Sequence, residues 1–555
     1  MRRNYGRYSQ AMRQADRPRR EPKTIASTHA TDGSRLDDDA RPVDYPTTLD
    51  SRLLMTIVAC LMLTVMVTLD TTVVNVAQRT FIDEFSSTQA LVAWTSTGYT
   101  LSLAAVIPLT GWAANRLGTK RLAIASVLLF TFGSLLCGMA SNITQLVAFR
   151  ALQGLGGGIV IPLQLIILAR AAGPARLARV MTISNITALM APIFGPVLGG
   201  WLISSFGWQW IFLINIPMGA LALALAVFVL PSNDSLPAES LDVLGMIVLS
   251  PGLVLLLYGL SLLPERGTAS DPHTWVPITV GVMLTGAFVL HALRRADHAL
   301  IDLRLLKNRT VAAANGTRFV FAVAFFGSCL LFPAYFQQVL GKTPLQSGLV
   351  LIPQSLAAAV TVPIVGRLME TRGPRRVVLG GTAATVVGMG MFVYGMSQEH
   401  VHLTVLLAGL ATFGAGSACM MVPVSWSAVH TLNSSEVAHG STLFNVNHTV
   451  AASVGAALMS VMLTSRFNAS ANIAAARQAD SIRAEAARRL APLDPAKLPS
   501  QVRLPDFTEH LTNDLSLAYA GVFLIATIVV AATVVPASLL PKRPGGQVEL
   551  LQVEP

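Results

Sequence analysis

Ionisable side chains inside apolar stretches are the residues of this sequence that could do chemistry. The clearest is Asp70, in the string Leu69-Asp70-Thr71-Thr72. A carboxylate at the centre of a membrane helix costs about 2.5–3.5 kcal/mol on insertion scales, so it needs a reason to be there. We predict that Asp70 is a proton or cation site that faces a central cavity. The alternative is a structural carboxylate, hydrogen-bonded near the outer interface.

A second candidate is Arg150, which opens an apolar stretch and is followed one turn later by Gln153. The glycines that come next, Gly154 among them, thin one face of the helix, so a neighbouring helix or a ligand can approach closely. We predict that Arg150 lines a cavity or relays protons. The alternative is a topological anchor at the membrane surface.

Two basic side chains belong to later apolar stretches. Arg318 either extends its guanidinium to the cytoplasmic interface or lines the cavity. His448 could join proton coupling, because histidine titrates near neutrality; the alternative is a polar residue that packs between helices. The side chains predicted to line a substrate cavity are Asn75, Tyr99, Gln153, Arg318 and Asn445.

Transmembrane helices must position these side chains. The 555 residues are 53% hydrophobic and 12% charged, against about 25% charged in soluble domains, which argues against a soluble enzyme. The net charge of +11 does not indicate nucleic-acid binding, because the bases lie in short segments between apolar runs. Fourteen apolar spans are predicted, at about 53–77, 88–111, 121–140, 145–169, 178–204, 210–230, 241–263, 275–293, 311–335, 345–366, 377–396, 402–425, 439–464 and 515–539.

The charges between the spans predict the orientation. Bases follow spans two, four, eight, ten and fourteen, so these segments and both termini are expected on the cytoplasmic side. The segment after span six disagrees, because it carries Asp234, Glu239 and Asp242 without a base. The long loop at 465–514 falls on the outer side, and its stretch 471–489 is predicted to form a short exposed helix.

Two loops repeat one pattern, which suggests that the chain contains two related sets of helices. The loop after span two contains Gly111, Asn115, Arg116, Gly118, Lys120 and Arg121. The loop at 366–376, after span ten, has glycine at the same two positions, Glu370 where the first has Asn115, and two bases at the end. Repeated helical sets are a known construction of transporters.

The repeat predicts an all-α polytopic membrane protein with two six-helix halves and two extra central helices. The expected parts are a disordered cytoplasmic tail at 1–51, an N-terminal half at 52–230, two linker helices at 231–310, a C-terminal half at 311–539 and a cytoplasmic tail at 540–555.

The fifth span carries a string of prolines and glycines at 191–200, which includes Gly195, Pro196, Gly199 and Gly200. The proline removes a helix hydrogen bond, and the glycines allow two helices to pack closely.

With these strings the chain resembles the major facilitator superfamily, specifically the fourteen-span drug:proton antiporters of the EmrB/QacA type. The resemblance covers about residues 53–464 and the last span. The matching strings are the family's first-helix motif at 69–77, motif A at 111–121, motif B at 150–158, the antiporter motif C at 191–200, and a string typical of this branch at 208–217.

The resemblance implies a major facilitator fold in which two halves rock around a central cavity. Motif C is associated with export, so proton entry would drive the substrate out. Three positions depart from the family: Asn115 stands where motif A usually has an aspartate, and Gln209 and His448 stand where relatives often have arginine.

The function expected from the sequence is proton-coupled export of drugs or other small amphiphilic compounds across a bacterial cytoplasmic membrane. Efflux of cationic substrates is expected to require Asp70. The alternative is a dedicated exporter of an endogenous metabolite, siderophore or lipid. A membrane enzyme or sensor is least supported, because no loop carries a paired catalytic constellation. No metal spacing and no GxxxxGK[ST] nucleotide motif occur, so the proton gradient is the expected energy source, without a cofactor. The expected partners are the substrate, protons and lipid; the sequence does not tell whether a periplasmic adaptor and an outer-membrane channel join them.

Overall fold

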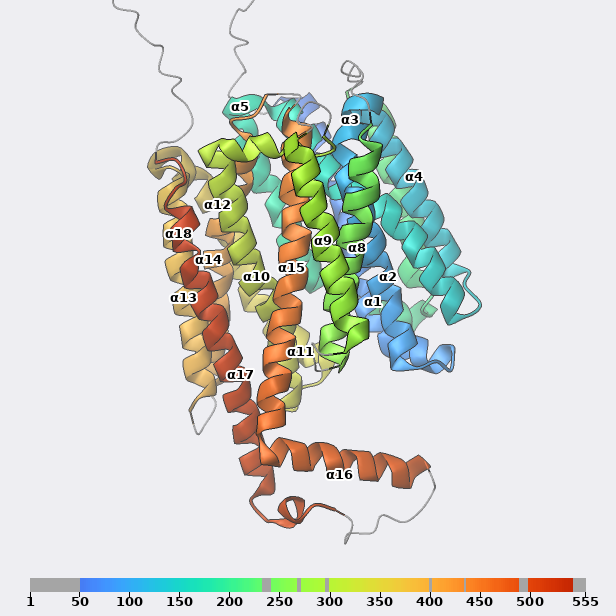
Figure 1. Ribbon diagram of the computed structural model, residues 1–555, viewed down its shortest axis with the longest axis vertical. Helices are drawn as coiled ribbons and strands as arrows, with labels where there is room; N and C mark the ends of the chain where they lie inside the picture. Colours follow the sequence, from blue (N-terminus) through green and yellow to red (C-terminus); the bar gives the residue numbers. More distant parts are fainter. Residues whose placement is uncertain are drawn as a thin grey trace, which may run out of the picture. The chain divides into compact units, whose positions relative to one another are not determined.

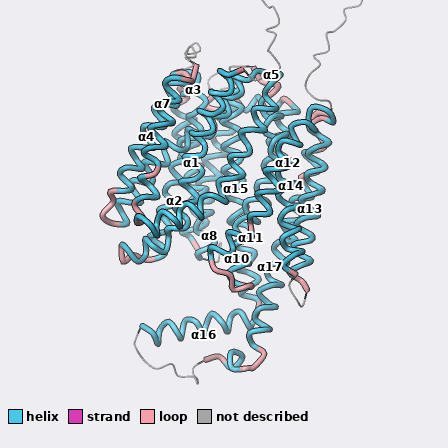
Figure 2. Tube along the Cα trace, turned by 180° about the vertical axis from the view of Figure 1, so that it is seen from behind, coloured by secondary structure: helices cyan, strands magenta, loops and turns pink. Residues whose placement is uncertain are grey.

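A computed structural model of the chain describes residues 50–231, 241–266, 271–294, 299–398, 402–433, 436–488 and 498–542. This described part is built of helices (Figure 1), and no strand occurs in it (Figure 2). The predicted tails at 1–51 and 540–555 fall almost entirely outside the described residues.

The helices fall into three consecutive groups. The first consists of α1 (Ser51–Glu84), α2 (Gln89–Val106), η1 (Ile107–Leu109), α3 (Thr110–Leu117), α4 (Thr119–Gly138), α5 (Ile143–Phe206), α6 (Trp210–Leu213) and α7 (Asn215–Phe228). The second consists of α8 (Val243–Arg266), α9 (Pro272–Arg294) and η2 (Leu303–Lys307). The third consists of α10 (Arg309–Gln338), α11 (Pro344–Val350), α12 (Ile352–Arg372), α13 (Pro374–Met396), α14 (Leu403–Val429), α15 (Glu436–Ala469), α16 (Ala471–Arg488), η4 (Ser500–Arg503), α17 (Phe507–Ala532) and α18 (Val534–Ala537).

The helices carry apolar side chains on the outside as well as the inside. Phe228, Met283 and Val535 are 85%, 68% and 71% exposed, as lipid-facing positions require. Among the described residues, thirteen helices are long and apolar enough to cross a membrane. The predicted fifth span, 178–204, is the second arm of α5, where many side chains are not described. The prediction of an all-helical, multi-pass membrane protein is confirmed.

Two predicted spans are joined without a loop. Helix α5 leaves helical geometry only at Gly173, with φ 65° and ψ 172°, a conformation that glycine adopts at little steric cost. The base-rich segment expected as a loop between spans four and five is therefore helical on both sides of this bend.

The second group joins the other two. Helix α8 packs against α9, α2 and α15. At its start Asp242 accepts hydrogen bonds from the backbone N–H groups of Gly245 and Leu300 and lies 2.9 Å from His291 Nε2. Burial raises the pKa of the Asp242 carboxyl, but these hydrogen bonds outweigh burial and keep the pKa below its usual value. Asp242, one of the three acids in the segment that disagreed with the charge rule, therefore connects the start of α8 with His291 on α9 and with the backbone at Leu300.

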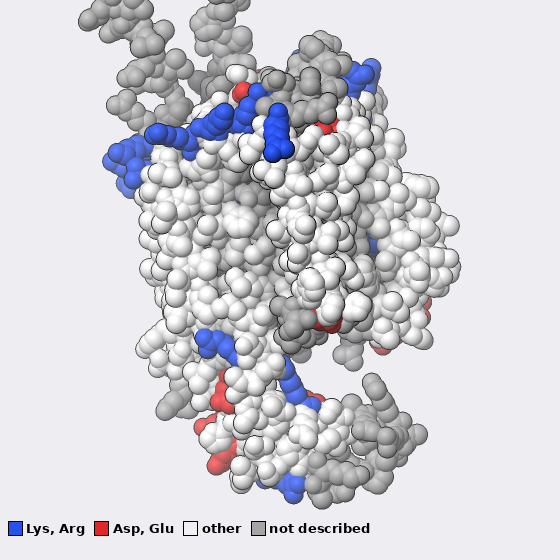
Figure 3. Space-filling model, viewed as in Figure 1, with Lys and Arg blue, Asp and Glu red and all other residues white. Residues whose placement is uncertain are grey.

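Charge gathers at the ends of the helices. A row of Lys and Arg follows the upper edge of the face in Figure 3, and the middle of that face is almost entirely uncharged. Helix α3 and the bend of α5 lie at this base-rich end, and α16 lies at the opposite end (Figure 1).

The predicted helix in the long loop is confirmed as α16. It is not exposed on all sides, because Ile473, Ala475 and Ala479 are buried. Asp514 at the start of the last span accepts hydrogen bonds from Ser470 and Asn472, which anchors the beginning of α16.

Candidate functional site

A buried polar cluster lies inside the N-terminal half. Asp70 on α1 and Arg150 on α5 are 2% and 1% exposed, and Arg150 Nη1 lies 2.5 Å from Asp70 Oδ2. The other carboxylate oxygen accepts hydrogen bonds from Gln153 Nε2 and Asn215 Nδ2, each at 2.9 Å. The carboxylate therefore has a counter-charge and two neutral donors, which offset the cost of burying it.

Further contacts complete the cluster. Arg150 Nε donates to the Thr95 carbonyl, its Nη1 also donates to Gln153 Oε1, and its Cζ lies 4.1 Å from the centre of the Tyr99 ring. The Ser134 hydroxyl accepts from Gln153 and Asn215. Helices α1, α2, α4, α5 and α7 thus meet at one network, so a change in the charge of Asp70 would be felt by all five.

The structure brings together Asp70, Arg150, Gln153 and Tyr99 but places them differently from the prediction. None of the four lines the central cavity; they lie within the N-terminal half, behind its wall. Asp70 is nevertheless next in sequence to Thr71, which does line the cavity. Ser134 and Asn215 are further partners in this cluster that are not among the residues predicted from the sequence. Their polarity within apolar spans is the signal that could have indicated them.

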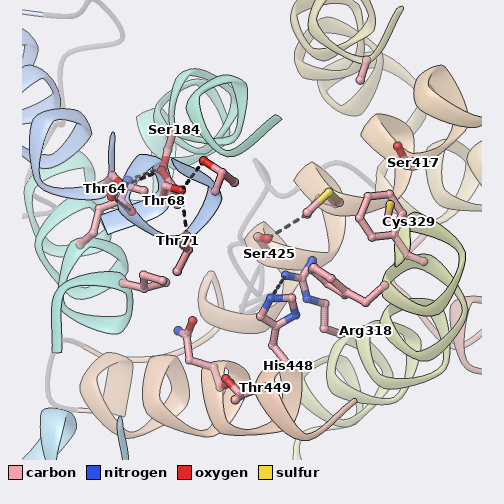
Figure 4. Close-up of a pocket in the computed structure, with 18 of the residues that line it drawn as sticks. Thr64, Thr68, Thr71, Ser184, Arg318, Cys329, Ser417, Ser425, His448 and Thr449 are labelled. Atoms are coloured by element: carbon pink, nitrogen blue, oxygen red, sulfur yellow. Dashed lines mark hydrogen bonds between the residues drawn. The ribbon is translucent and has the colours of Figure 1, made fainter. Parts of the chain in front are cut away.

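A cavity of about 470 Å³ lies between the two halves. Thr64, Thr68, Thr71 and Ser184 lie on its N-terminal wall, and Arg318, His448 and Thr449 lie on the facing wall (Figure 4). Phenylalanines of α10 and Phe444 of α15 supply apolar surface. None of the described residues that line the cavity is acidic.

Arg318 lies in this cavity wall, so the alternative of an interfacial guanidinium is wrong. It is nine residues into α10, roughly 14 Å along the helix axis, and only 8% exposed. Its Nη2 lies 3.5 Å from His448 Nε2, and its Cζ lies 5.1 Å from the centre of the Phe444 ring. Asn445 also lines the cavity, as predicted. The side chain of Asn75 lies outside the described residues.

The glycines of motif B and motif C provide close helix contacts. A Cβ at Gly154 would lie 2.5 Å from the Tyr99 carbonyl oxygen on α2, and one at Gly195 would overlap Thr72 on α1. A Cβ at Gly199 would lie 3.0 Å from Val73. Gly200 is different, because no neighbouring atom lies within 4 Å of its Cβ position. The expectation that Gly200 allows close packing is therefore wrong. The side chain of Pro196 is not described.

The two repeated loops make equivalent contacts between the halves. A Cβ at Gly111 would lie 2.8 Å from Thr442 Oγ1 and 2.9 Å from the Ala438 carbonyl oxygen, both on α15. A Cβ at Gly366 would lie 2.9 Å from Thr182 Oγ1 on α5. Gly118 and Gly373 both have positive φ, 82° and 77°. The halves therefore touch at the base-rich end through a symmetric pair of contacts.

The loop at 111–121 has a buried polar contact at Asn115, where the motif that it resembles usually has an aspartate. Asn115 is 3% exposed, and its Oδ1 accepts a hydrogen bond of 2.7 Å from Arg170 Nη2. The loop's own bases lie nearer solvent: Arg116 and Arg121 are exposed, and Lys120 is half-buried. Asparagine can accept from Arg170 but brings no counter-charge.

Comparison with known proteins identifies the family of the chain. The model of the Major Facilitator Superfamily matches residues 60–456. The chain belongs to this superfamily. This confirms the resemblance found from the motifs, and the first-helix motif, motif A, motif B and motif C described above all lie within the matched region.

Relatives within the superfamily have names that refer to drug resistance. Multidrug resistance protein B homolog of Mycobacterium tuberculosis is 49% identical over 499 residues, which cover 90% of this chain and 92% of that protein. Multidrug export protein EmrB of Haemophilus influenzae is 30% identical over 430 residues, 76% of this chain and 82% of that protein.

Solved structures agree with the fold. The human organic anion transporter MFSD10 matches with a TM-score of 0.54 and 13% identity, over 86% of this chain and 99% of that one. The proton:xylose symporter XylE matches with a TM-score of 0.52 and 13% identity, over 87% of this chain and 96% of that one. At this identity the likeness concerns the fold alone.

Proposed function

We propose that this major facilitator is a proton-coupled antiporter that exports drugs or other small amphiphilic compounds. Its family and its relatives make it a multi-pass membrane transporter related to multidrug-resistance proteins. The observation that supports proton coupling is the buried Asp70–Arg150 pair, which adjoins the cavity wall through Thr71. We assign the carboxylate of Asp70 as the proton carrier, Arg150 as its counter-charge, and His448 as a second titratable group.

Protonation of Asp70 would rearrange its network. The ionised carboxylate accepts hydrogen bonds from three side chains. A proton on either oxygen turns an acceptor into a donor, and Arg150 loses its counter-charge. Helices α1 and α5 carry this pair and also line the cavity, so their adjustment transmits the proton's arrival to the bound compound.

Alternating access would proceed through the contacts between the halves. Gly111 against α15 and Gly366 against α5 close the base-rich end. Their separation would open the cavity toward that end. The proposed location is a bacterial cytoplasmic membrane, with the base-rich end and both termini in the cytoplasm, as the positive-inside rule favours. The proposed partners are the transported compound, protons and lipid; the proton gradient supplies the energy without a cofactor.

The decisive test is transport of a panel of cationic, neutral and anionic fluorescent compounds, ethidium among them, in everted membrane vesicles. A protonophore should abolish transport, and ATP depletion under a maintained gradient should leave it intact. Asp70→Asn should insert normally but lose proton-dependent transport. The matched control is Asp83→Asn, an exposed position on the same helix. Full pH-dependent activity in Asp70→Asn would exclude Asp70 as the proton carrier.

The alternative, a dedicated exporter of one endogenous product, gives a different result in the same vesicles. In that case no drug of a broad panel would be transported under a proton gradient. A cell extract would instead contain one compound that the vesicles transport. The sequence and the cavity do not favour this alternative over drug export.

Orientation can be tested by labelling intact cells with a membrane-impermeant maleimide after replacement of the four native cysteines. Ser481→Cys on α16 should be labelled from outside, and Thr371→Cys at the base-rich end should not; both positions are exposed. The reverse pattern would invert the proposed topology and with it the direction of transport.

A further inference from the structure

We infer that the cavity binds anionic amphiphiles, with Arg318 as the group that recognises the negative charge. This inference rests on the proposed transport function and specifies its substrate class. It departs from the cationic substrates expected from the sequence, because the structure separates the cluster of Asp70 from the cavity.

The charges around the cavity favour an anion. Arg318 is the one Lys or Arg among the described lining residues, and none of these residues is acidic. The carboxylate of Asp70 is already paired with Arg150 inside the N-terminal half, and neither residue lines the cavity. The bound compound therefore meets an uncompensated positive charge and no negative one.

The guanidinium of Arg318 has no acidic partner among the described residues. Within the described part of the chain its Nε has no hydrogen-bond acceptor, and neither does Nδ1 of His448 have a partner. The contact between Arg318 Nη2 and His448 Nε2, at 3.5 Å, supplies no counter-charge. Buried polar groups are normally hydrogen-bonded, and a buried charge without a partner is costly. A carboxylate, sulfonate or phosphate head group would supply both the charge and the acceptors.

The guanidinium is held in place for such a contact. The ring of Phe444 lies 5.1 Å from Arg318 Cζ, and Phe326 packs edge-on against His448 at 5.0 Å. Asn445 and Thr449 lie beside this pair in the same wall. Planar guanidinium groups bind carboxylates with two parallel hydrogen bonds. The guanidinium of Arg318 is therefore a planar hydrogen-bond donor in the wall of a cavity whose other described lining residues include no Lys, Arg, Asp or Glu.

The remaining wall fits an apolar body. Phe325, Phe332 and Met421 line the same cavity, and so do threonines of α1. The volume of about 470 Å³ lies in the range of sites for drug-sized molecules, about 300–1,000 Å³. A molecule with one aromatic or alkyl body and one anionic head matches both the shape and the charge.

Three fluorescent probes with a common body test this inference: pyrenebutyrate, its methyl ester and the pyrenebutyl-trimethylammonium cation. Binding is measured on the purified full-length protein in detergent, at a pH where the carboxylate is ionised. We expect the wild type to bind the anion about tenfold or more tightly than the cation, after correction for partition into protein-free micelles. Equal or tighter binding of the cation would overturn the inference, and this comparison needs no variant.

The variants then assign the preference to Arg318. Arg318→Gln should weaken binding of pyrenebutyrate about tenfold and change binding of the ester less than about twofold. Arg309→Gln, on the exposed first turn of the same helix, is the matched control and should change neither. If Arg318→Gln weakened binding of all three probes equally, the residue would shape the cavity without recognising the charge of the ligand. That result would also overturn the inference.

Ethidium transport separates this inference from the proposed function. Proton-driven ethidium transport together with a cation preference among the probes would leave the proposed function standing and reject the inference. Tight binding of pyrenebutyrate without proton-driven transport of any compound would support the anion site and reject the proposed function.

Discussion

The two halves of this transporter each bury an arginine in a membrane helix, and they treat it differently. Arg150 in the N-terminal half is surrounded by Asp70, Gln153, the Thr95 carbonyl and the Tyr99 ring. Arg318 in the C-terminal half has a histidine, a phenylalanine ring and the cavity. Burial is similar, so the partners decide the role: one guanidinium is part of the structure, and the other is available to a ligand.

This difference divides the work of transport between the halves. The N-terminal half contains the carboxylate that could carry a proton, and the C-terminal half contains the charge that could hold a compound. The cavity lies between them, and Thr71 on its wall adjoins Asp70. Coupling then requires only that helices α1 and α5 move relative to α10 and α15.

The largest expected effect is on stability, and it distinguishes the two arginines. Arg150→Gln leaves Asp70 buried without its counter-charge, which should cost about 3–5 kcal/mol. Arg318→Gln removes a buried charge that has no counter-charge among the described residues, so stability should stay the same or increase. Thermal unfolding of the purified variants in detergent measures both. Similar losses of Tm in the two variants would contradict the distinction.

The second-largest effect tests whether Asp70 and Arg150 stabilise each other. The double variant Asp70→Asn/Arg150→Gln removes both charges and leaves neutral amides that can hydrogen-bond. It should be more stable than Arg150→Gln alone, with a coupling energy of about 2 kcal/mol in the double-mutant cycle. It should nevertheless remain inactive in proton-driven transport. Additive losses would mean that the two side chains do not stabilise each other.

A moderate effect is expected at the contacts between the halves, and it should be unequal. A Cβ at either glycine meets a threonine side chain, but one at Gly111 also meets the backbone carbonyl of Ala438 at 2.9 Å, and the backbone cannot rotate away. Overpacking costs about 1–3 kcal/mol, so Gly111→Ala should open the base-rich end more than Gly366→Ala. Ser441 on α15 is buried, and its hydroxyl donates to the Pro162 carbonyl on α5. Accessibility of Ser441→Cys to maleimide in everted vesicles therefore reports this opening.

Two glycines serve as controls for that experiment. Gly380→Ala and Gly200→Ala place a Cβ where no neighbouring atom lies within 4 Å, and both should leave accessibility unchanged. A larger effect of Gly366→Ala than of Gly111→Ala would show that the backbone contact is not what holds the end closed.

The smallest effect concerns motif A. Asn115→Asp turns the hydrogen bond from Arg170 into a charge-assisted one, which should add about 1 kcal/mol to the contact. The base-rich end should then stay closed longer, so ethidium transport should slow by severalfold while Tm rises slightly. Faster transport with unchanged Tm would mean that this contact does not stabilise the closed end.

The sequence was sufficient to predict the helices, the repeat and the superfamily. Apolar runs of membrane length and glycines with fixed spacing are local signals, and the shared positive φ of Gly118 and Gly373 confirms that the repeated loops adopt one conformation. The residues of the cluster were recognisable because a polar group in an apolar span is costly.

Contacts between helices were harder to predict from sequence. Asp70 was expected in the cavity, because nothing local shows that Asn215, on α7, reaches it from 145 residues away. Gly200 belongs to the same string as Gly199 but lies on a face without a neighbour. For Arg318 the sequence allows two locations, the cytoplasmic interface and the cavity wall. The length of an arginine side chain is known, but the sequence does not give the depth of its helix in the bilayer.

The unpartnered guanidinium of Arg318 has a consequence for the electrical balance of the cycle. A proton that enters and an anion that leaves move charge in the same direction, so one-for-one exchange is electrogenic, with two charges per cycle. At 100 mV, interior negative, this provides about 4.6 kcal/mol, at about 2.3 kcal/mol per charge, enough for roughly a thousandfold concentration ratio at about 1.4 kcal/mol per decade. One-for-one exchange of a proton for a cation would be electroneutral and would gain nothing from the voltage. The charge of the cavity wall would thus decide whether membrane potential or pH difference drives this transporter.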